Sequence, residues 1–488
     1  MEAHNNAVNT VARNIRIFHS TQRPFRVYHG STNSTRTSQR RADNTVDTSR
    51  LNHVIQIDHE NKTALVEPNV PMDALVQATL EHSLVPLVVM EFPNITVGGG
   101  FSGSSGESSS FRYGPFDSII NSIEIVVPSG EIEWASKTAK PDLFWGAASG
   151  FGTLGIVTLL EVQLRDAKPY VELTYHMFTS VPEASLSMQH QAQDASIDYL
   201  DGIAYASNRA IVCSGRLVNE VSGSTSLSHF TKRKDPWFYQ HVDRRTKGAS
   251  GPVTDYVPLV DYLFRYDRGG FWVAKYAFAY FFTPFNRATR SLLDRFLRAK
   301  VMYAALHKSQ LSDDYIVQDV GVPYEKVEEF QRWLDANLRT YPLWLCPLRV
   351  RRDLPDSRHG LHARFSDLDA PEYLLNFGIW RPGSLNRDKF VRQNRNLEKK
   401  VQELGGKKWL YAHAYYTEEE FWASYDRESY DDLRRRYSAA YLPSVYDKVK
   451  VDVEAERHRK KPFKGIRPLQ GLYGVYKAWK GGDYLLAK

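Results

Sequence analysis

The 488-residue sequence contains only two cysteines, Cys213 and Cys346, which lie far apart in two apolar runs. Buried free thiols are the expected state of such residues, and this usage fits a reducing compartment. No window of about eighteen uninterrupted apolar residues occurs, so the sequence predicts no membrane-spanning helix. The N-terminus lacks the apolar core of a signal peptide, and no internal repeat is evident.

A large excess of one charge is also missing. The chain has 63 Lys and Arg residues against 56 Asp and Glu residues, a formal net charge of +7. This balance permits anionic ligands or an acidic membrane surface, but no nucleic-acid partner is expected. The length exceeds that of one ordinary hydrophobic core, so we expect two domains.

Two glycine-rich stretches, at residues 96–114 and 141–158, each contain a G-x-G-x-x-G spacing. A Rossmann dinucleotide site needs a strand before this spacing and a helix opening from it. Serine-rich sequence follows the first stretch, and an alternating β-branched segment typical of a strand follows the second. We therefore expect glycine loops between extended segments, whose backbone can approach a phosphate or a flat ring closely.

The chain changes character near residue 165. The first part predicts a hairpin over residues 54–66, a helix that starts at Pro71 and a hairpin turn at residues 128–130. Beyond residue 166, helices with charged faces alternate with strand-like runs, including residues 409–416, as in an α+β fold. The predicted domains are residues 1–165 and 166–450. A basic C-terminal extension, residues 451–488, is either a solvated tail or a patch for phosphates or lipid headgroups.

A third motif, Arg26-Val-Tyr-His-Gly-Ser-Thr-Asn-Ser-Thr-Arg36, predicts a tight turn whose amides and hydroxyls suit a pyrophosphate. With the two glycine-rich stretches it makes residues 20–165 resemble the PCMH-type FAD-binding domain of the vanillyl-alcohol-oxidase superfamily. Residues 10–450 are similar to the Δ24-sterol reductase family. The markers include Val66-Glu-Pro-Asn-Val-Pro-Met-Asp-Ala, Gly106-Glu-Ser-Ser-Ser-Phe-Arg-Tyr-Gly, Lys234-Asp-Pro-Trp-Phe-Tyr-Gln-His-Val and Glu419-Glu-Phe-Trp.

The resemblance implies an α+β fold: a PCMH-type FAD-binding domain of two α+β subdomains, then an α+β substrate or cap domain with an antiparallel sheet. It also implies noncovalent FAD, NADPH as the reductant, and reduction of a C=C bond in a hydrophobic, sterol- or terpenoid-like small molecule. A dehydrogenase or oxidase, a redox-neutral cyclase or isomerase, and a flavin-loaded binding protein are the alternatives. The expected location is the cytoplasm, or peripheral contact with the endoplasmic reticulum membrane. The oligomeric state stays open.

The resemblance also implies the cofactor-binding residues. They are His29, Gly30, Ser31, Thr32, Asn33, Ser34, Thr35, Val97, Gly98, Gly99, Ser102, Gly103, Ser104, Glu107, Ser108, Ser109, Tyr113, Gly155, Ile156 and Val157. Asn33 occupies the first-loop position at which covalent relatives carry a tethering histidine. No metal site is expected.

Reduction of an unactivated alkene needs a proton donor close to one carbon. On the expected strand at residues 409–416, Tyr411, His413 and Tyr415 share one face, and His413 titrates near neutral pH. Asp319 falls where related flavin oxidases place substrate contacts. Packed or structural side chains are the alternative for all four. Two arginines, Arg268 and Arg349, are candidates for an anionic ligand or for ordinary salt bridges.

Overall fold

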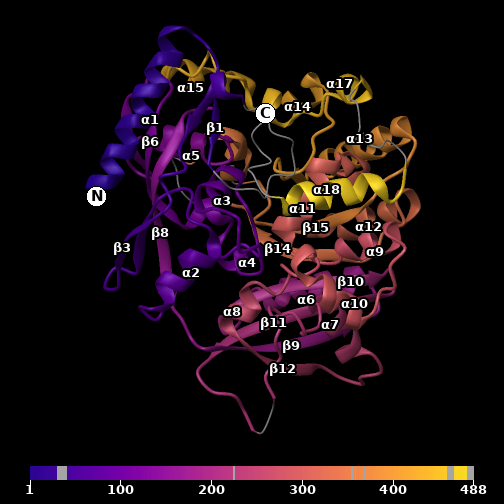
Figure 1. The fold of residues 1–488 in the computed structure, drawn as a ribbon. Coiled ribbons are helices and arrows are strands. Elements are labelled where there is room, and N and C mark those ends of the chain that lie inside the picture. Colours follow the sequence, from indigo (N-terminus) through magenta and orange to yellow (C-terminus); the bar gives the residue numbers. More distant parts are fainter. Residues whose placement is uncertain are drawn as a thin grey trace.

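The computed structural model describes residues 1–29, 41–223, 226–352, 357, 359–367, 369–458 and 466–480. Two antiparallel sheets organise these residues (Figure 1). The smaller sheet has the strand order β3-β4-β8-β6-β7, with β5 also paired to β8, and the larger has the order β12-β9-β11-β10-β14-β15-β13-β16. The predicted α+β fold with antiparallel sheets is confirmed.

The smaller sheet forms from the N-terminal third of the chain. Its strands are β3 (Val54–Asp58), β4 (Thr63–Val66), β5 (Leu84–Pro86), β6 (Ile120–Val126), β7 (Ile132–Ser136) and β8 (Ile156–Asp166). The helices here are α1 (Glu2–Ser20), α2 (Met72–Leu80), α3 (Val97–Gly103), α4 (Ser110–Tyr113) and α5 (Pro141–Ala147), and β1 (Arg26–Tyr28) pairs in parallel with β2 (Thr45–Asp47). The β3–β4 hairpin, the helix after Pro71 and the β6–β7 turn confirm the sequence predictions.

The first glycine-rich stretch was expected to be a loop, and this is wrong. It folds as the short helix α3, although glycine is a poor helix former. The Thr96 hydroxyl caps the helix by accepting a hydrogen bond from the Gly99 N–H at 3.2 Å, and Val97 and Phe101 are fully buried. Local capping and burial together outweigh the unfavourable propensity.

The larger sheet is built from the rest of the chain. Its strands are β9 (Tyr170–Phe178), β10 (Tyr199–Ala206), β11 (Arg209–Val218), β12 (Val253–Pro258), β13 (Tyr315–Pro323), β14 (Leu343–Arg349), β15 (Tyr373–Pro382) and β16 (Lys407–Lys408). Alternate residues of β14 face opposite sides, as strand geometry requires. Leu343 and Leu345 pack in one buried cluster with α6 (Val181–Gln191), α12 (Val327–Asn337) and α13 (Arg387–Glu403). Trp344 and Cys346 belong to the cluster that includes residues of the smaller sheet.

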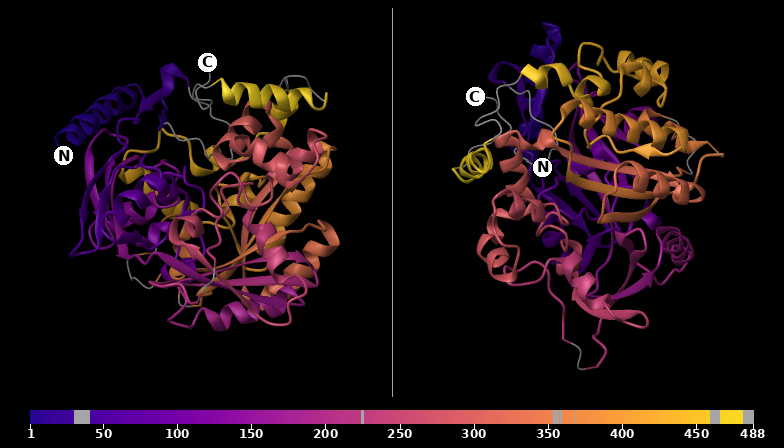
Figure 2. Two further views of the ribbon diagram at one scale, coloured as in Figure 1. Left: turned by 60° about the horizontal axis from the view of Figure 1, so that its bottom comes forward. Right: turned by 90° about the vertical axis from the view of Figure 1, so that its right-hand side faces the viewer.

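The remaining helices surround these sheets. They are α7 (Phe238–Thr246), α8 (Leu259–Leu263), α9 (Ala274–Tyr280), α10 (Arg287–Leu293), α11 (Ala299–Ser309), α14 (Glu418–Trp422), α15 (Arg427–Arg436), α16 (Val445–Val449), α17 (Val453–His458) and α18 (Leu469–Trp479). The α14 capping box between Thr417 and Glu420 is confirmed. In Figure 2, α18 lies at the periphery of the molecule in both views.

Two further expectations can be compared with the structure. The predicted strand at residues 409–416 is wrong: only residues 407–408 pair in the sheet, and the Ala412 N–H donates to the Trp409 carbonyl in a turn. The prediction of buried free thiols is confirmed for Cys213 and Cys346. Within the described ranges, no helix combines the length and apolarity that crossing a membrane requires.

Candidate functional site

A cavity of about 560 Å³ is lined by residues of both parts of the chain. One wall consists of backbone from α3 and from the start of β8. A second group of lining residues consists of aromatic and acidic residues from the larger sheet, α11 and the segment after β16. A third group of lining residues comes from β1, from the residue after it and from the chain around α16. It contains the basic residues Arg26, His29, Lys448 and Lys450 and the acidic residues Asp447, Asp452 and Glu456.

The glycine wall depends on close packing that a side chain would disrupt. A Cβ on Gly98 would lie 2.6 Å from the Pro68 Cβ, and a Cβ on Gly155 would lie 2.5 Å from the Val126 carbonyl oxygen. Gly155 also has a φ of +138°, a region that favours glycine. By contrast, a Cβ on Gly99 would have only the Thr96 hydroxyl within 4 Å, at 3.0 Å. The wall therefore offers bare backbone to whatever occupies the cavity.

The structure places the predicted cofactor-binding residues in three groups. Those that line the cavity are His29, Gly98, Gly99, Ser102, Gly103, Gly155, Ile156 and Val157. Those within the described ranges that do not line it are Val97, Ser104, Glu107, Ser108, Ser109 and Tyr113. The first-loop residues Gly30, Ser31, Thr32, Asn33, Ser34 and Thr35 lie outside the described residues.

Glu107 illustrates the second group. Its buried carboxylate accepts hydrogen bonds from the Ser108 hydroxyl at 2.8 Å and from the Ser109 N–H at 2.8 Å. These bonds span one and two residues and shape the turn that leads into α4. Burial nevertheless raises the pKa of Glu107 above its usual value. The residue stabilises the loop behind the cavity wall.

Asp319, in the middle of β13, is the most unusual acid among the predicted residues. It is 4% exposed, and its carboxyl oxygens accept hydrogen bonds from the Asn376 side-chain amide and from the Trp380 indole N–H, both at 3.3 Å. Both donors are neutral. Burial outweighs them and raises the pKa of Asp319 to about 7. Near neutral pH this carboxyl can therefore both release and recover a proton.

The other three catalytic candidates separate in space. Tyr411 and His413 line the cavity, whereas Tyr415 does not. Tyr415 packs against Phe390 instead, with ring centroids 5.9 Å apart, and its N–H donates to Glu398 at 2.9 Å. Because the segment is a turn rather than a strand, alternate residues do not share a face.

The backbone at His413 is fixed from β13. Its carbonyl accepts a hydrogen bond from the Gln318 side-chain amide at 3.0 Å and a second one from the Lys408 ammonium. Gln318 is the immediate neighbour of Asp319 and is fully buried. One strand thus carries Asp319 and also positions the turn that brings Tyr411 and His413 to the cavity.

One lining residue was not recognised from the sequence. Glu91 is 8% exposed, and its Oε1 has no hydrogen-bond partner among the described residues. Burial, together with the nearby Glu107 carboxylate, raises the pKa of Glu91 well above its usual value. The available signal was a single acid within the otherwise apolar run Leu87-Val-Val-Met-Glu-Phe92. A lone carboxyl in such a run is unexpected unless it has a function or a partner.

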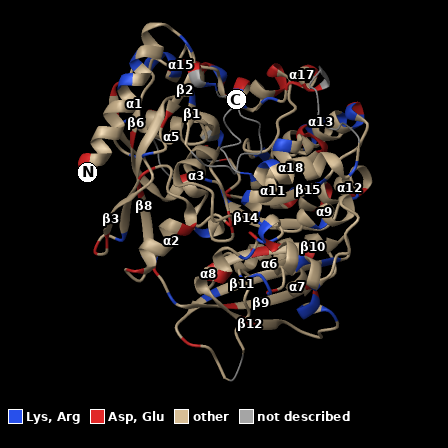
Figure 3. Ribbon diagram, viewed as in Figure 1, with Lys and Arg blue, Asp and Glu red and all other residues tan. Residues whose placement is uncertain are grey.

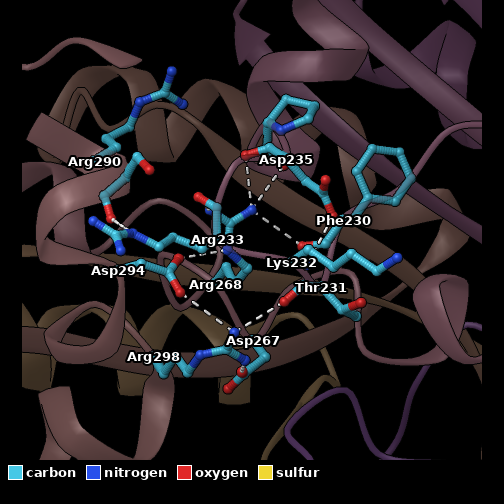
Figure 4. Close-up of polar contacts among 12 residues, drawn as sticks. Phe230, Thr231, Lys232, Arg233, Asp235, Asp267, Arg268, Arg290, Asp294 and Arg298 are labelled. Carbon is cyan, nitrogen blue, oxygen red and sulfur yellow. Dashed lines mark hydrogen bonds and ion pairs between the residues drawn. The ribbon is translucent and has the colours of Figure 1, made fainter. Parts of the chain in front are cut away.

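The two candidate arginines do not line the cavity. Arg268 is 2% exposed, and Figure 4 shows it within a cage of polar groups. Its guanidinium donates to the Asp294 carboxylate at 2.7 Å and to the Asp235 carbonyl at 2.8 Å. Arg349 donates to Glu372 at 3.1 Å. These contacts agree with the salt-bridge alternative for both residues, although Arg268 is buried rather than on the surface.

The donor set of the cavity fits a dinucleotide such as FAD. Bare glycine backbone allows close approach of a flat ring or a phosphate, and the basic group supplies charge for a pyrophosphate. Two of these cations have defined contacts: Lys448 donates to the Phe151 carbonyl, and Lys450 pairs with Asp447 at 3.0 Å. Because the Lys450 ammonium pairs with a carboxylate, the net positive charge of this group is smaller than the number of its lysines indicates.

Comparison with known proteins defines the class. Residues 6–136 match the FAD binding domain family. The chain is 27% identical to the Delta(24)-sterol reductase of Homo sapiens over 418 residues, 84% of this chain and 77% of that protein. The Arabidopsis thaliana Delta(24)-sterol reductase is also 27% identical, over 441 residues and with the same coverage. Cytokinin dehydrogenase 6 of Oryza sativa subsp. japonica is 30% identical over 132 residues, 26% of this chain and 25% of its own length.

The chain is therefore an FAD-dependent oxidoreductase with a PCMH-type FAD-binding domain. Within that class, the predicted resemblance to the Δ24-sterol reductase family is confirmed, because the similarity covers most of both chains.

Proposed function

We propose that the protein reduces a C=C bond of a hydrophobic, sterol- or terpenoid-like substrate, with noncovalent FAD as cofactor and NADPH as reductant. The observation that carries this proposal is one cavity in which glycine residues of the FAD-binding part and a buried, protonatable carboxyl of the larger sheet, Asp319, are both lining residues. FAD, when bound, supplies hydride transfer. The activity for which the relatives are named, Delta(24)-sterol reductase, supports a Δ24-unsaturated sterol as the first substrate to test.

The cofactor would be held by the glycine wall and the basic group. Gly98, Gly99 and Gly155 would present backbone to it, and Arg26 and Lys448, which also line the cavity, would supply positive charge for its phosphates. Asn33 stands at the first-loop position where covalent relatives carry a histidine that is bonded to the flavin. The side-chain amide of asparagine does not form this bond. This supports a noncovalent cofactor.

The substrate would lie against the aromatic side chains. Phe271, Trp344 and Trp380 pack together, with Phe271 ring centroids 5.3 Å from Trp344 and 4.3 Å from Trp380. All three line the cavity. Such a surface favours a flat or ring-shaped apolar molecule, because burial of apolar area drives its binding.

We assign the proton to Asp319. Alkene reduction delivers hydride to one carbon and a proton to the other, so one acid must release a proton in each turnover. Asp319 lies beside Trp380, within this aromatic part of the cavity, and its pKa of about 7 allows it to regain a proton from solvent. Glu91 has the different role of a neutral acid that donates a hydrogen bond to a polar group of the substrate.

The test separates the two half-reactions. The flavin-loaded protein is mixed anaerobically with NADPH, and loss of the visible flavin absorbance is followed by stopped flow; a Δ24-unsaturated sterol is then added. We expect rapid bleaching, and recovery of the colour with formation of the saturated sterol. If NADPH does not bleach the flavin, NADPH is not the reductant. If the flavin colour returns on addition of oxygen but not on addition of any alkene, the dehydrogenase or oxidase alternative is favoured.

A further inference from the structure

The C-terminal helix α18 exposes an apolar stripe. Leu469, Leu472, Tyr476 and Trp479 follow one another at intervals of three and four residues, so they share one face of the helix. Their exposed fractions are 46%, 50%, 49% and 61%, respectively. Ile466, three residues before Leu469, is 53% exposed. Contiguous exposed apolar side chains of this size mark a surface that binds something.

The orientation of the stripe is fixed by the opposite face of the helix. The Gln470 side-chain amide donates to the Ser309 carbonyl on α11 at 2.8 Å. A Cβ on Gly474 would lie 2.3 Å from the Ala305 carbonyl oxygen, so glycine is needed for this close contact with α11. Figure 1 shows α18 lying along α11. The protein therefore presents the stripe outward by specific packing.

Phe282 extends this surface. It is 76% exposed and directly follows Phe281, whose ring would lie 2.7 Å from a Cβ on Gly471 of α18. The segment after α9 and the helix α18 are thus neighbours. Within this aromatic run the structure buries Phe278 but exposes Phe282.

Along the sequence, the charged residues nearest to the stripe are basic. Residues 457–482 contain no Asp or Glu. The basic residues in this segment are Arg457, Arg459, Lys460, Lys461, Lys464, Arg467, Lys477 and Lys480. In Figure 3 most of α18 is tan, as expected for a helix whose only charged residue is Lys477, with Lys480 just beyond its end. An apolar stripe with Tyr and Trp, with Arg467, Lys477 and Lys480 as its charged neighbours in the described part of this segment, is typical of a helix that lies in a membrane interface.

We propose that α18, together with Phe282, binds the surface of an anionic lipid bilayer. The stripe would enter the boundary between headgroups and acyl chains, and Arg467, Lys477 and Lys480 would contact acidic headgroups. A second copy of the chain fits less well, since a two-fold contact through α18 would bring these like-charged segments together. The proposal does not depend on the substrate.

The experiment measures co-sedimentation of the full-length, flavin-loaded protein with vesicles. One set is phosphatidylcholine alone, and the other contains about 30% phosphatidylserine. Wild-type protein should bind the anionic vesicles at least about tenfold more tightly, with binding weakened by added salt. The double variant Leu472→Ser/Trp479→Ser should lose about tenfold or more of this affinity. The double variant Lys477→Glu/Lys480→Glu should bind both vesicle types equally weakly.

The matched control is Ile132→Ser/Trp134→Ser, which removes two exposed apolar residues from β7 in the other sheet. It should bind like wild type. Circular dichroism and bound flavin establish that each variant is folded. Wild-type protein that binds neither vesicle, or a stripe variant that binds like wild type, would overturn the proposal. A stripe variant that instead converts a dimer to a monomer would assign the surface to a second copy.

Discussion

Replacing Asp319 with asparagine tests the central feature of the site, a buried acid that retains its proton near pH 7. Asparagine has nearly the same shape and cannot ionise. Asp319 has a folded-state pKa of about 7, above the value of about 4 expected in the unfolded chain. Its favourable contribution to folding is therefore complete below pH 4 and is lost as the pH rises to 7, because only the unfolded state ionises in that range.

The size of the effect follows from the shift. Each unit corresponds to about 1.4 kcal/mol, so a rise from 3.8 to about 7 costs the wild type on the order of 4 kcal/mol above pH 7. Between pH 5 and pH 8, wild-type stability should fall by about 3 kcal/mol more than that of Asp319→Asn. Any fixed cost of the new amide is the same at both pH values, and it cancels from this difference.

The assay is urea unfolding of the flavin-loaded protein at pH 5 and pH 8, followed by circular dichroism. Asp58→Asn, in the β3–β4 hairpin of the other sheet, is the control, and its stability should change between the two pH values as that of the wild type does. If Asp319→Asn and wild type change in parallel between the two pH values, Asp319 titrates in its ordinary range and cannot be the proton donor. In turnover, alkene reduction by wild type should decline above pH 7, while Asp319→Asn should be slow and independent of pH in this range.

Three further outcomes are expected. Glu91→Leu should raise KM for the sterol about tenfold. Glu91→Gln still donates a hydrogen bond, so its KM should lie close to that of the wild type. Glu107→Gln is the control: it should lower thermal stability and leave KM unchanged. His4→Ala should lower the melting temperature at pH 6.5, because His4 bridges two buried glutamates and has a pKa raised to about 9 by these hydrogen bonds; the deficit should shrink as the pH rises through 9. Gly99→Asp should yield folded but colourless protein, and stoichiometric flavin in that variant would show that α3 does not contact the cofactor.

Short-range patterns predicted most of the local structure. The β3–β4 hairpin, the start of α2 at Pro71 and the α14 capping box each depend on residues within about ten positions of one another. The same holds for the strand that follows Gly155, which begins at Ile156 as the alternation of apolar residues indicates. These features were predictable because the interactions that stabilise them are encoded locally.

The wrong prediction of a strand at residues 409–416 involves a contact between distant parts of the chain. The segment after β16 alternates like a strand, but the Trp409 indole N–H donates to the Ser104 carbonyl at 2.9 Å, 305 residues away in the sequence. This contact and the Lys408 bond to the His413 carbonyl turn the chain away from the sheet. Glu91 escaped notice for a related reason. Its importance lies in the cavity that surrounds it, and the sequence shows only one acid among apolar neighbours.

Helix α11 connects the two functional proposals physically. One of its residues, Tyr303, lines the cavity, and burial raises the pKa of its phenol. Two turns of helix contain Tyr303 and the residues that receive α18, namely Ala305 and Ser309. Helix α18 would therefore lie between a bound bilayer and α11, the element that forms part of the cavity wall. For a hydrophobic substrate this arrangement shortens the path through water, which is the unfavourable step for an apolar molecule.

If vesicles that contain the sterol increase turnover in wild type but not in Leu472→Ser/Trp479→Ser, while both enzymes reduce detergent-solubilised sterol equally well, α18 delivers substrate to the cavity. Equal stimulation of both enzymes would restrict α18 to a role that is separate from catalysis.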